Sequence, residues 1–215
     1  MTPIILVLVL TLASLLSVTP AAHAASSDLH LTQQVEVLQS GAPVLRESRD
    51  LYIQGTAMLM KNSSRSLLIR PDLGKAYLLD PTRALLGEIP MTQLTPEMTG
   101  GAPGSTPGGP MPPIRATGEK RTIQGLHCDV HRSTIQAISA EVCITRELAV
   151  LERLQGKLGV TADVPGIPVE YLIQVETPDK SGTLTIRQRL TKVERTPQDP
   201  ALFTVPGVPG QARKP

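Results

Sequence analysis

Alternation of apolar and polar residues dominates the chain, and this pattern predicts β-strands. The stretch 33–39, QQVEVLQ, places Val35 and Val37 on one face of an extended segment. A longer extended run covers 50–62 and contains Gly55, which predicts a bend or bulge inside it. Further apolar runs follow at short spacing and are separated by turn residues. Most of the chain is therefore predicted to be β-structure.

The clearest pair of strands lies near the C-terminal end, in 168–176 and 183–195. Both segments alternate, so each places its apolar residues on one face. These residues are Val169, Tyr171, Ile173 and Val175 in the first segment and Leu184 and Ile186 in the second. The spacing then slips, because Leu190 and Val193 are an odd number of residues apart, which predicts a bulge or a strong bend. Long bent strands favour a curled sheet.

Two segments depart from this pattern. Residues 145–159 carry leucines at helical spacing behind Thr145, a suitable N-cap, and they predict one helix packed on the sheet. Residues 100–113, GGAPGSTPGGPMPP, cannot bury enough apolar surface to offset the entropy of ordering. They are predicted to form a disordered loop within one domain, and they lack the Gly-Lys-Ser/Thr ending of a phosphate-binding loop.

The N-terminus predicts export. An apolar run covers Ile4 to Val18, Pro20 interrupts it, and the small-x-small sequence ending at Ala24 suits a signal peptidase. We expect residues 1–24 to be a signal peptide, 25–206 one domain, and 207–215 a flexible tail. The mature protein would then be periplasmic or secreted in a bacterium, and no later segment is apolar for long enough to span a membrane.

Composition narrows the function further. The formal net charge is only +2, so the chain has no concentrated basic face for nucleic acid. It contains no Trp, one Phe and three Tyr, which argues against stacking of nucleic-acid bases or sugars on aromatic platforms. The interior must therefore be built from aliphatic residues and Met.

The stretch 125–144 contains both cysteines, Cys128 and Cys143, together with His127 and His131. In an oxidising compartment two cysteines are expected to pair, so a disulfide that staples a hairpin is the favoured interpretation. A Cys2His2 metal site is the less favoured one, because adjacent residues of a strand point to opposite faces. A nucleophilic cysteine beside a histidine remains a further alternative.

Catalytic signatures are missing from the sequence: it has no Gly-x-Ser-x-Gly elbow, no His-Glu-x-x-His and no Cys-x-x-Cys. We therefore predict a protein that is not an enzyme and that has no cofactor, no catalytic residue and no metal ligand.

The order of several motifs resembles an uncharacterised exported bacterial family that is itself similar to the outer-membrane lipoprotein carrier LolA and its relatives. The motifs extend from residue 48 to residue 206. They read SRDLYIQGTAMLM, LLIRPDLGKAYLLDPTRALLGEI, GEKRTIQGLHCDVHR, EVCITREL, GIPVEYLI and LTKVERTPQDPALFTVPGVP. The resemblance implies an α+β, mostly β fold: a strongly curved antiparallel sheet, or half-open β-barrel, wrapped around one or more helices. Relatives of this fold hold acyl chains between sheet and helices.

The leading hypothesis is a non-enzymatic periplasmic carrier or binding protein for an acyl chain, a lipid or a lipoprotein, acting as a monomer. Its candidate cavity residues are Met58, Met60, Val169, Tyr171, Ile173, Leu184 and Ile186. Met58 and Met60 share one face, and flexible thioethers suit an adaptable apolar cavity, although they also suit a plain core. The alternative hypothesis is a structural or sensor module that binds an envelope protein. A metal protein centred on His127 and His131 is the third.

Overall fold

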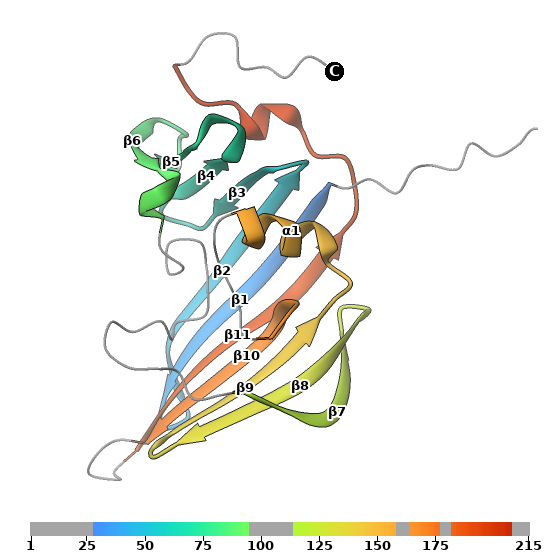
Figure 1. Cartoon of the computed structure of the whole chain (residues 1–215). Coiled ribbons are helices and arrows are strands. Elements are labelled where there is room, and N and C mark those ends of the chain that lie inside the picture. The colour runs from blue at the N-terminus through green and yellow to red at the C-terminus, as the bar shows by residue number, and fades with distance from the viewer. Residues whose placement is uncertain (1–27, 95–113, 158–163, 177–181, 208–215) are drawn as a thin grey trace, which may run out of the picture.

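A computed structural model describes residues 28–94, 114–157, 164–176 and 182–207 of the chain. These residues form one antiparallel sheet of 11 strands and the helix α1 (Figure 1). The mostly β fold predicted from the sequence is thereby confirmed. The signal peptide, the Gly/Pro-rich loop at 100–113 and the tail after residue 207 lie outside the described residues and stay predictions.

The strands have the following bounds: β1 Leu29–Gln39, β2 Ala42–Gln54, β3 Ala57–Lys61, β4 Ser66–Arg70, β5 Lys75–Leu79, β6 Leu85–Pro90, β7 Arg115–Ile123, β8 Leu126–Ile135, β9 Ile138–Thr145, β10 Ile167–Glu176 and β11 Thr183–Glu194. The helix α1 covers Ala149–Lys157, and three short 3-10 helices cover Pro71–Leu73 (η1), Met91–Gln93 (η2) and Pro200–Phe203 (η3).

The first strand lies inside the sheet, because β1 pairs with both β2 and the last strand, β11. The order across the sheet is β6-β5-β4-β3-β2-β1-β11-β10-β9-β8-β7. Each wing of the sheet is a series of neighbours in sequence, so most pairings form by hairpins, and only the β1–β11 pairing spans the whole domain. The sheet is open, with β6 and β7 as its edges.

The predicted irregularity near the end of the chain is a β-bulge. Thr32 pairs with Lys192 and Gln33 pairs with Leu190, so Thr191 is the extra residue on β11. The bulge lets Leu190 and Val193 reach the same core cluster despite their odd spacing. A second shift separates Pro168 from Glu170 in the pairing of β10 with β9.

The run 50–62 is not one bent strand, as the sequence suggested, but a hairpin. Gly55, with φ +58°, forms the turn between β2 and β3 with Thr56, and Gln54 pairs with Ala57. A positive φ favours glycine, and two residues suffice to reverse an antiparallel pair.

The predicted helix exists but begins at Ala149 rather than behind Thr145. Thr145 is the last residue of β9 and pairs with Ile167, while its hydroxyl accepts a bond from the Glu147 amide. Leu148, Leu151 and Leu154 are buried in one cluster with residues of both wings, among them Leu31. The helix therefore covers the sheet near the end where β1 begins (Figure 1). No described helix is long and apolar enough to span a bilayer.

A second cluster lies on the other face of β2–β5. Tyr52, Leu59, Leu68 and Tyr77 are successive cross-strand partners there, and η3 buries Phe203 against the same cluster. The C-terminal segment thus closes the face of this wing that α1 leaves free.

The buried positions of β8 change phase within the strand. Leu126, Cys128 and Val130 are buried in the cluster around α1, whereas His131 and Ser133 are the buried residues that follow. Because successive residues of a strand face opposite sides, β8 packs one face in the helix-covered core and buries its other face further along the strand.

Candidate functional site

The register of the sheet brings residues from six strands into one mostly apolar row. Cross-strand partners project from the same face, so a chain of pairings defines a continuous surface. From β2 to β8 the successive partners are Leu45, Val37, Ile186, Ile173, Ala140 and Ser133. Five of these six residues are apolar, so the row forms an apolar surface. It crosses the half of the sheet that lies farther from α1, which we call the far half.

Two neighbouring rows extend this surface. Towards the hairpin ends of the strands, the successive partners are Leu184, Val175, Ile138 and Ile135. Towards α1 they are Val35, Gln188, Tyr171, Val142 and His131. We call the residues of these three rows the apolar face.

On β1, the apolar face continues from the residues that pack against α1. Val35 and Val37 lie on the same side of β1 as Leu29 and Leu31, which pack in the cluster around the helix. On β8 and β9, the residues of the cluster around α1, such as Cys128 and Cys143, lie on the opposite side of the strand from the apolar face. Among the described residues, α1 is the only α-helix, and its buried leucines belong to that cluster. The residues of the far half instead form a cluster of their own.

Exposure along the apolar face increases towards its rim. Tyr171 and Ile173 are buried, and burial raises the pKa of the Tyr171 hydroxyl to about 12. Ile186 and Leu184 are half-buried, while Leu45 is 51% exposed and Ile138 is 45% exposed. An apolar molecule could therefore approach from the rim, where apolar area is still in contact with water.

Two further residues pack against this cluster: Ile114, just before β7, and Val164, just before β10. Each stands directly after a segment that lies outside the described residues, 95–113 and 158–163.

The seven cavity residues predicted from the sequence fall into two groups. Met58, Met60 and Val169 pack in the cluster around α1. Tyr171, Ile173 and Ile186 belong to the far cluster, and Leu184 stands in the row beside them. The four residues of the second group therefore lie together on the apolar face, and the first three lie under the helix. Whether any of them lines a ligand cavity stays a prediction.

Several residues of the apolar face are absent from that prediction: Val37, Leu45, Val142 and Ser133. Alternation placed Val37 on one face of its strand together with Val35. It could not show which distant strand would pair with that strand. Ser133 gives no sequence signal, because a serine in a strand is usually exposed. Only the pairing of β8 with β9 places it opposite Ala140.

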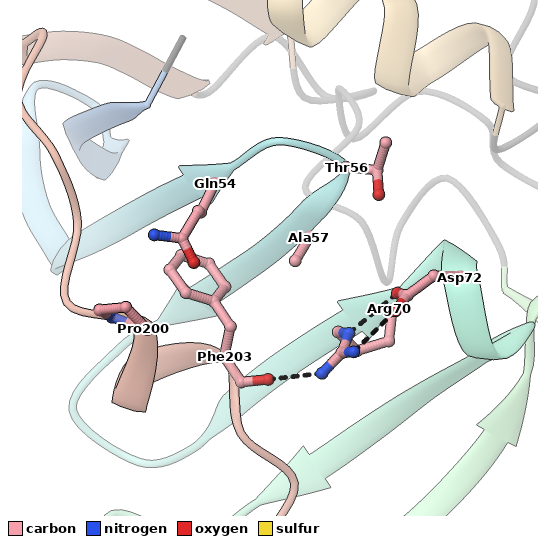
Figure 2. A pocket seen from close by; sticks show the side chains of 7 residues that line it. All are labelled: Gln54, Thr56, Ala57, Arg70, Asp72, Pro200 and Phe203. Carbon is pink, nitrogen blue, oxygen red and sulfur yellow. Dashed lines mark hydrogen bonds and ion pairs between the residues drawn. The ribbon is translucent and has the colours of Figure 1, made fainter. Parts of the chain in front are cut away.

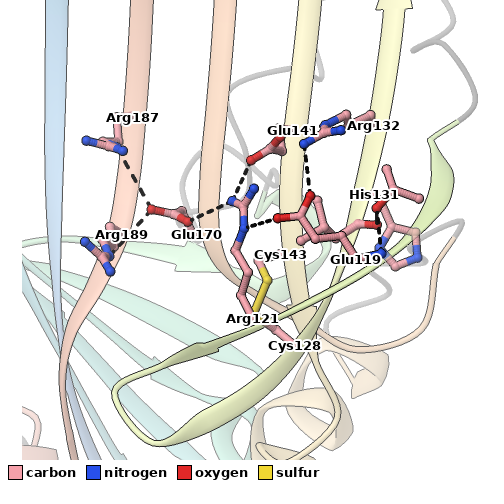
Figure 3. Close-up of polar contacts among 12 residues, drawn as sticks. Glu119, Arg121, Cys128, His131, Arg132, Glu141, Cys143, Glu170, Arg187 and Arg189 are labelled. Atoms are coloured by element: carbon pink, nitrogen blue, oxygen red, sulfur yellow. Dashed lines mark hydrogen bonds and ion pairs between the residues drawn. A yellow bond between two sulfur atoms is a disulfide. The ribbon is translucent and has the colours of Figure 1, made fainter.

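The opposite face of this half of the sheet is charged (Figure 3). Arg121 contacts Glu119, Glu141 and Glu170 at 2.7, 2.6 and 3.5 Å, and Arg132 contacts Glu141 at 2.7 Å. Burial acts to raise the pKa of Glu141, but hydrogen bonds from the two arginines outweigh it, so the pKa lies below its usual value. Arg121 spans three strands because its partners come from β7, β9 and β10.

The disulfide predicted from the sequence is confirmed, and both of its cysteines are buried in the cluster around α1. Cys128 and Cys143 are bonded, with their Cα atoms 5.4 Å apart. They link β8 to β9 beside Arg121, which is the cross-strand partner of Cys128 (Figure 3). The two histidines lie apart from the sulfurs: His127 is exposed and contacts Glu147 at 2.8 Å, while His131 is buried and contacts the Asp129 carbonyl at 3.0 Å.

A small depression lies at the other end of the molecule, between β2–β4 and η3 (Figure 2). Its free volume is about 30 Å³, and Arg70 and Phe203 are among its lining residues. The guanidinium of Arg70 donates two bonds to Asp72, at 2.9 and 2.7 Å, and one to the carbonyl of Phe203, at 2.8 Å. Arg70 therefore anchors the C-terminal segment, and none of the predicted cavity residues lines this depression.

Comparison with known proteins gives matches among solved structures. No family model and no curated protein matches it. Among solved structures, a LolA superfamily protein from Nitrosomonas europaea matches 82% of this chain and 90% of its own, with 9% identity and a TM-score of 0.33. A DUF1329 family protein from Desulfovibrio piger matches 84% of this chain and 91% of its own, with 11% identity and a TM-score of 0.33.

A PNGF-II structure matches 82% of this chain with 10% identity and a TM-score of 0.40, but the chain spans only 29% of its length. A LolA superfamily protein is thus among the solved structures that match the chain. With TM-scores of 0.40 or below, these matches do not indicate a function.

Proposed function

We propose that the protein is an exported, non-enzymatic carrier or binding protein for an acyl chain, as found in a lipid or a lipoprotein. The observation that carries the proposal is the row from Leu45 to Ala140, in which five strands contribute apolar side chains to one face. A flexible hydrocarbon chain is a ligand that such a flat row can bind without specific hydrogen bonds.

In this proposal the four predicted residues Tyr171, Ile173, Leu184 and Ile186 contact the acyl chain. Met58, Met60 and Val169 support the helix-covered end of the same site. We further propose that the sheet curls around α1 as a half-open barrel, so that the apolar face lies on its inner side. The disulfide supports an oxidising compartment, such as the periplasm reached after cleavage near Ala24.

The energetic argument is the burial of apolar surface. Burial of a large aliphatic side chain is worth about 1.5–3 kcal/mol. At the rim, Leu45 and Ile138 are still about half exposed, at 51% and 45%. A bound acyl chain would remove this area from water, whereas in the free protein it stays hydrated.

The test measures binding of parinaric acid, a naturally fluorescent fatty acid, to the purified mature protein. Leu45→Asn and Ile186→Asn should each weaken binding about tenfold, because ~1.4 kcal/mol corresponds to a factor of ten. Thr185→Asn is the matched control, because Thr185 neighbours Ile186 on the opposite face of β11. Native mass spectrometry of the unmodified protein should find a co-purified lipid. Absence of both lipid and probe binding would refute the proposal.

A second candidate function, a module that binds an envelope protein, rests on the sheet edge at β6. Leu85 and Leu86 are 39% and 60% exposed on this edge strand, and an exposed edge can accept a strand from a partner. A stoichiometric protein partner that is lost on Leu86→Lys, together with no lipid binding, would favour this function over the carrier.

A further inference from the structure

We infer that the ligand of the apolar face carries a neutral, hydrogen-bonding head group that docks at the hydroxyl of Ser133. The inference rests on the proposed acyl-binding function and specifies the chemistry of its ligand. Ser133 is 6% exposed, and its Oγ has no hydrogen-bond partner among the residues that the structure describes. It ends the row of the apolar face, where it pairs with Ala140.

The unbonded hydroxyl of Ser133 is unusual because buried polar groups in native proteins almost always have a partner. The buried hydroxyl of Thr145 follows this rule, because it accepts a bond from the Glu147 amide. An unbonded buried hydroxyl costs stability that an apolar residue of similar size would not cost. A ligand that supplies the missing bond recovers this cost on binding.

The side chains next to Ser133 do not compete for its hydroxyl. Its cross-strand partner Ala140 and the next residue of the row, Ile173, are apolar. Two positions away on the same side of β8, His131 already directs its Nδ1 at the Asp129 carbonyl. A serine hydroxyl has one donor and two acceptor positions, so it can bond either a carbonyl or a hydroxyl of the ligand.

The charge pattern favours a neutral head group over a carboxylate. The three rows of the apolar face contain no lysine and no arginine among their described residues. Arg132, the nearest arginine in sequence, pairs with Glu141 on the opposite face of β8 and β9. An ionised carboxylate would therefore lose hydration at Ser133 without gaining a cation, whereas an ester, amide or hydroxyl group would not pay this penalty.

The experiment compares three probes with the same hydrocarbon chain: monopalmitin with a neutral glycerol ester head, palmitate with a carboxylate, and hexadecane with no head group. The unmodified protein should bind monopalmitin about tenfold more tightly than hexadecane. Ser133→Ala should remove this preference and leave hexadecane binding unchanged. Ser133→Thr keeps a hydroxyl and should retain the preference.

Ser139→Ala is the matched control, because Ser139 lies on β9 and faces the charged side of the sheet. It should leave all three affinities unchanged. Urea unfolding of ligand-free Ser133→Ala should show unchanged or higher stability, since the alanine removes an unbonded hydroxyl.

The outcomes separate this inference from the proposed function. If none of the three probes binds, the proposed function fails and the inference fails with it. If the probes bind but Ser133→Ala alters none of the affinities, or weakens all three equally, only the inference is overturned. Tighter binding of palmitate than of monopalmitin, or a clear loss of stability in ligand-free Ser133→Ala, would also overturn it.

Discussion

Reduction of the Cys128–Cys143 disulfide should lower the free energy of unfolding by about 3 kcal/mol. The bond closes a loop with a sequence separation of 15 residues. In the chain-entropy account, a loop of this length restrains the unfolded chain by ~3 kcal/mol. Both sulfurs stay in the folded protein when the bond is reduced, so packing changes little and the loss reports mainly on the unfolded state.

The assay is urea unfolding of the oxidised and the reduced protein, followed by the circular dichroism of the sheet, because the chain has no tryptophan to report by fluorescence. With a slope of about 2 kcal/mol per molar urea, the midpoint should fall by roughly 1.5 M. The double variant Cys128→Ala, Cys143→Ala should lose somewhat more, since the cysteines are only 3% and 1% exposed and the missing sulfurs leave space in the core.

The control is the double variant with reductant, which should give the same midpoint as without it. A midpoint shift below about 0.5 M on reduction of the unmodified protein would refute the loop-closure reasoning, because a slope of ~2 kcal/mol per molar then leaves only about 1 kcal/mol for the cross-link. Loss of the sheet signal without any denaturant would refute it as well, since the bond would then hold the folded state together directly.

Three further predictions concern other contacts. Arg70→Met should lower the free energy of unfolding in urea by about 1–3 kcal/mol, because the buried carbonyl of Phe203 loses its hydrogen-bond donor. Limited proteolysis should then cut the chain after β11 faster. Unchanged resistance to proteolysis would contradict the role of Arg70 as an anchor of the C-terminal segment. Glu141 has a lowered pKa in the folded protein, so its contribution to stability is present above its ordinary pKa of 4.5 and is lost as the pH falls through the pKa of the folded state. Glu141→Gln should therefore reduce the loss of melting temperature at acidic pH. An unchanged acid profile of the melting temperature would argue against this prediction. Burial raises the pKa of Tyr171 to about 12, so its contribution to stability is full below its ordinary pKa of 10 and is lost between about pH 10 and 12. Tyr171→Phe should reduce this loss of stability at alkaline pH. A tyrosine absorbance titration that is complete by pH 11 would contradict the burial of Tyr171.

The strands were predictable from the sequence where one face of each strand is strictly apolar. In β10, Val169, Tyr171 and Ile173 occupy every second position, and the structure buries all three. The bulge at Thr191 was also predictable, because it changes the phase of the apolar positions along one strand. Such signals are local, so they can be recognised in the sequence without knowledge of the partner strand.

The start of the helix was not predictable, because tertiary pairing overrides a local capping signal there. Thr145 has the side chain of an N-cap, but it pairs with Ile167, and Cys143 two residues earlier is held by the disulfide. The chain therefore stays extended through Thr145, and the helix begins only at Ala149. Gly55 is similar, since a glycine in an apolar run signals a bend, bulge or turn, and only the pairing of Gln54 with Ala57 identifies the turn.

The candidate site could be predicted only in part, because its rows depend on pairings between strands far apart in sequence. Alternation gives the side of each strand on which Ile173 or Ile186 lies. It does not show that Val37 joins them, because that requires the pairing of β1 with β11. It also does not show that α1 divides the predicted residues into a covered group with Met58 and a second group with Tyr171.

The two faces of the β8–β11 half differ in what they still offer a ligand. On the charged face, Glu141 already contacts two arginines and Glu170 three, so a charged partner would have to displace existing ion pairs to gain its own. On the apolar face, Leu45 and Ile138 keep apolar area in water, and Ser133 keeps an unbonded hydroxyl. Hydrated apolar area and unbonded buried polar atoms raise the free energy of the ligand-free protein, so a ligand that covers or bonds them gains the most free energy on binding. The apolar face therefore carries the stronger case for the binding site, although both faces belong to the same strands.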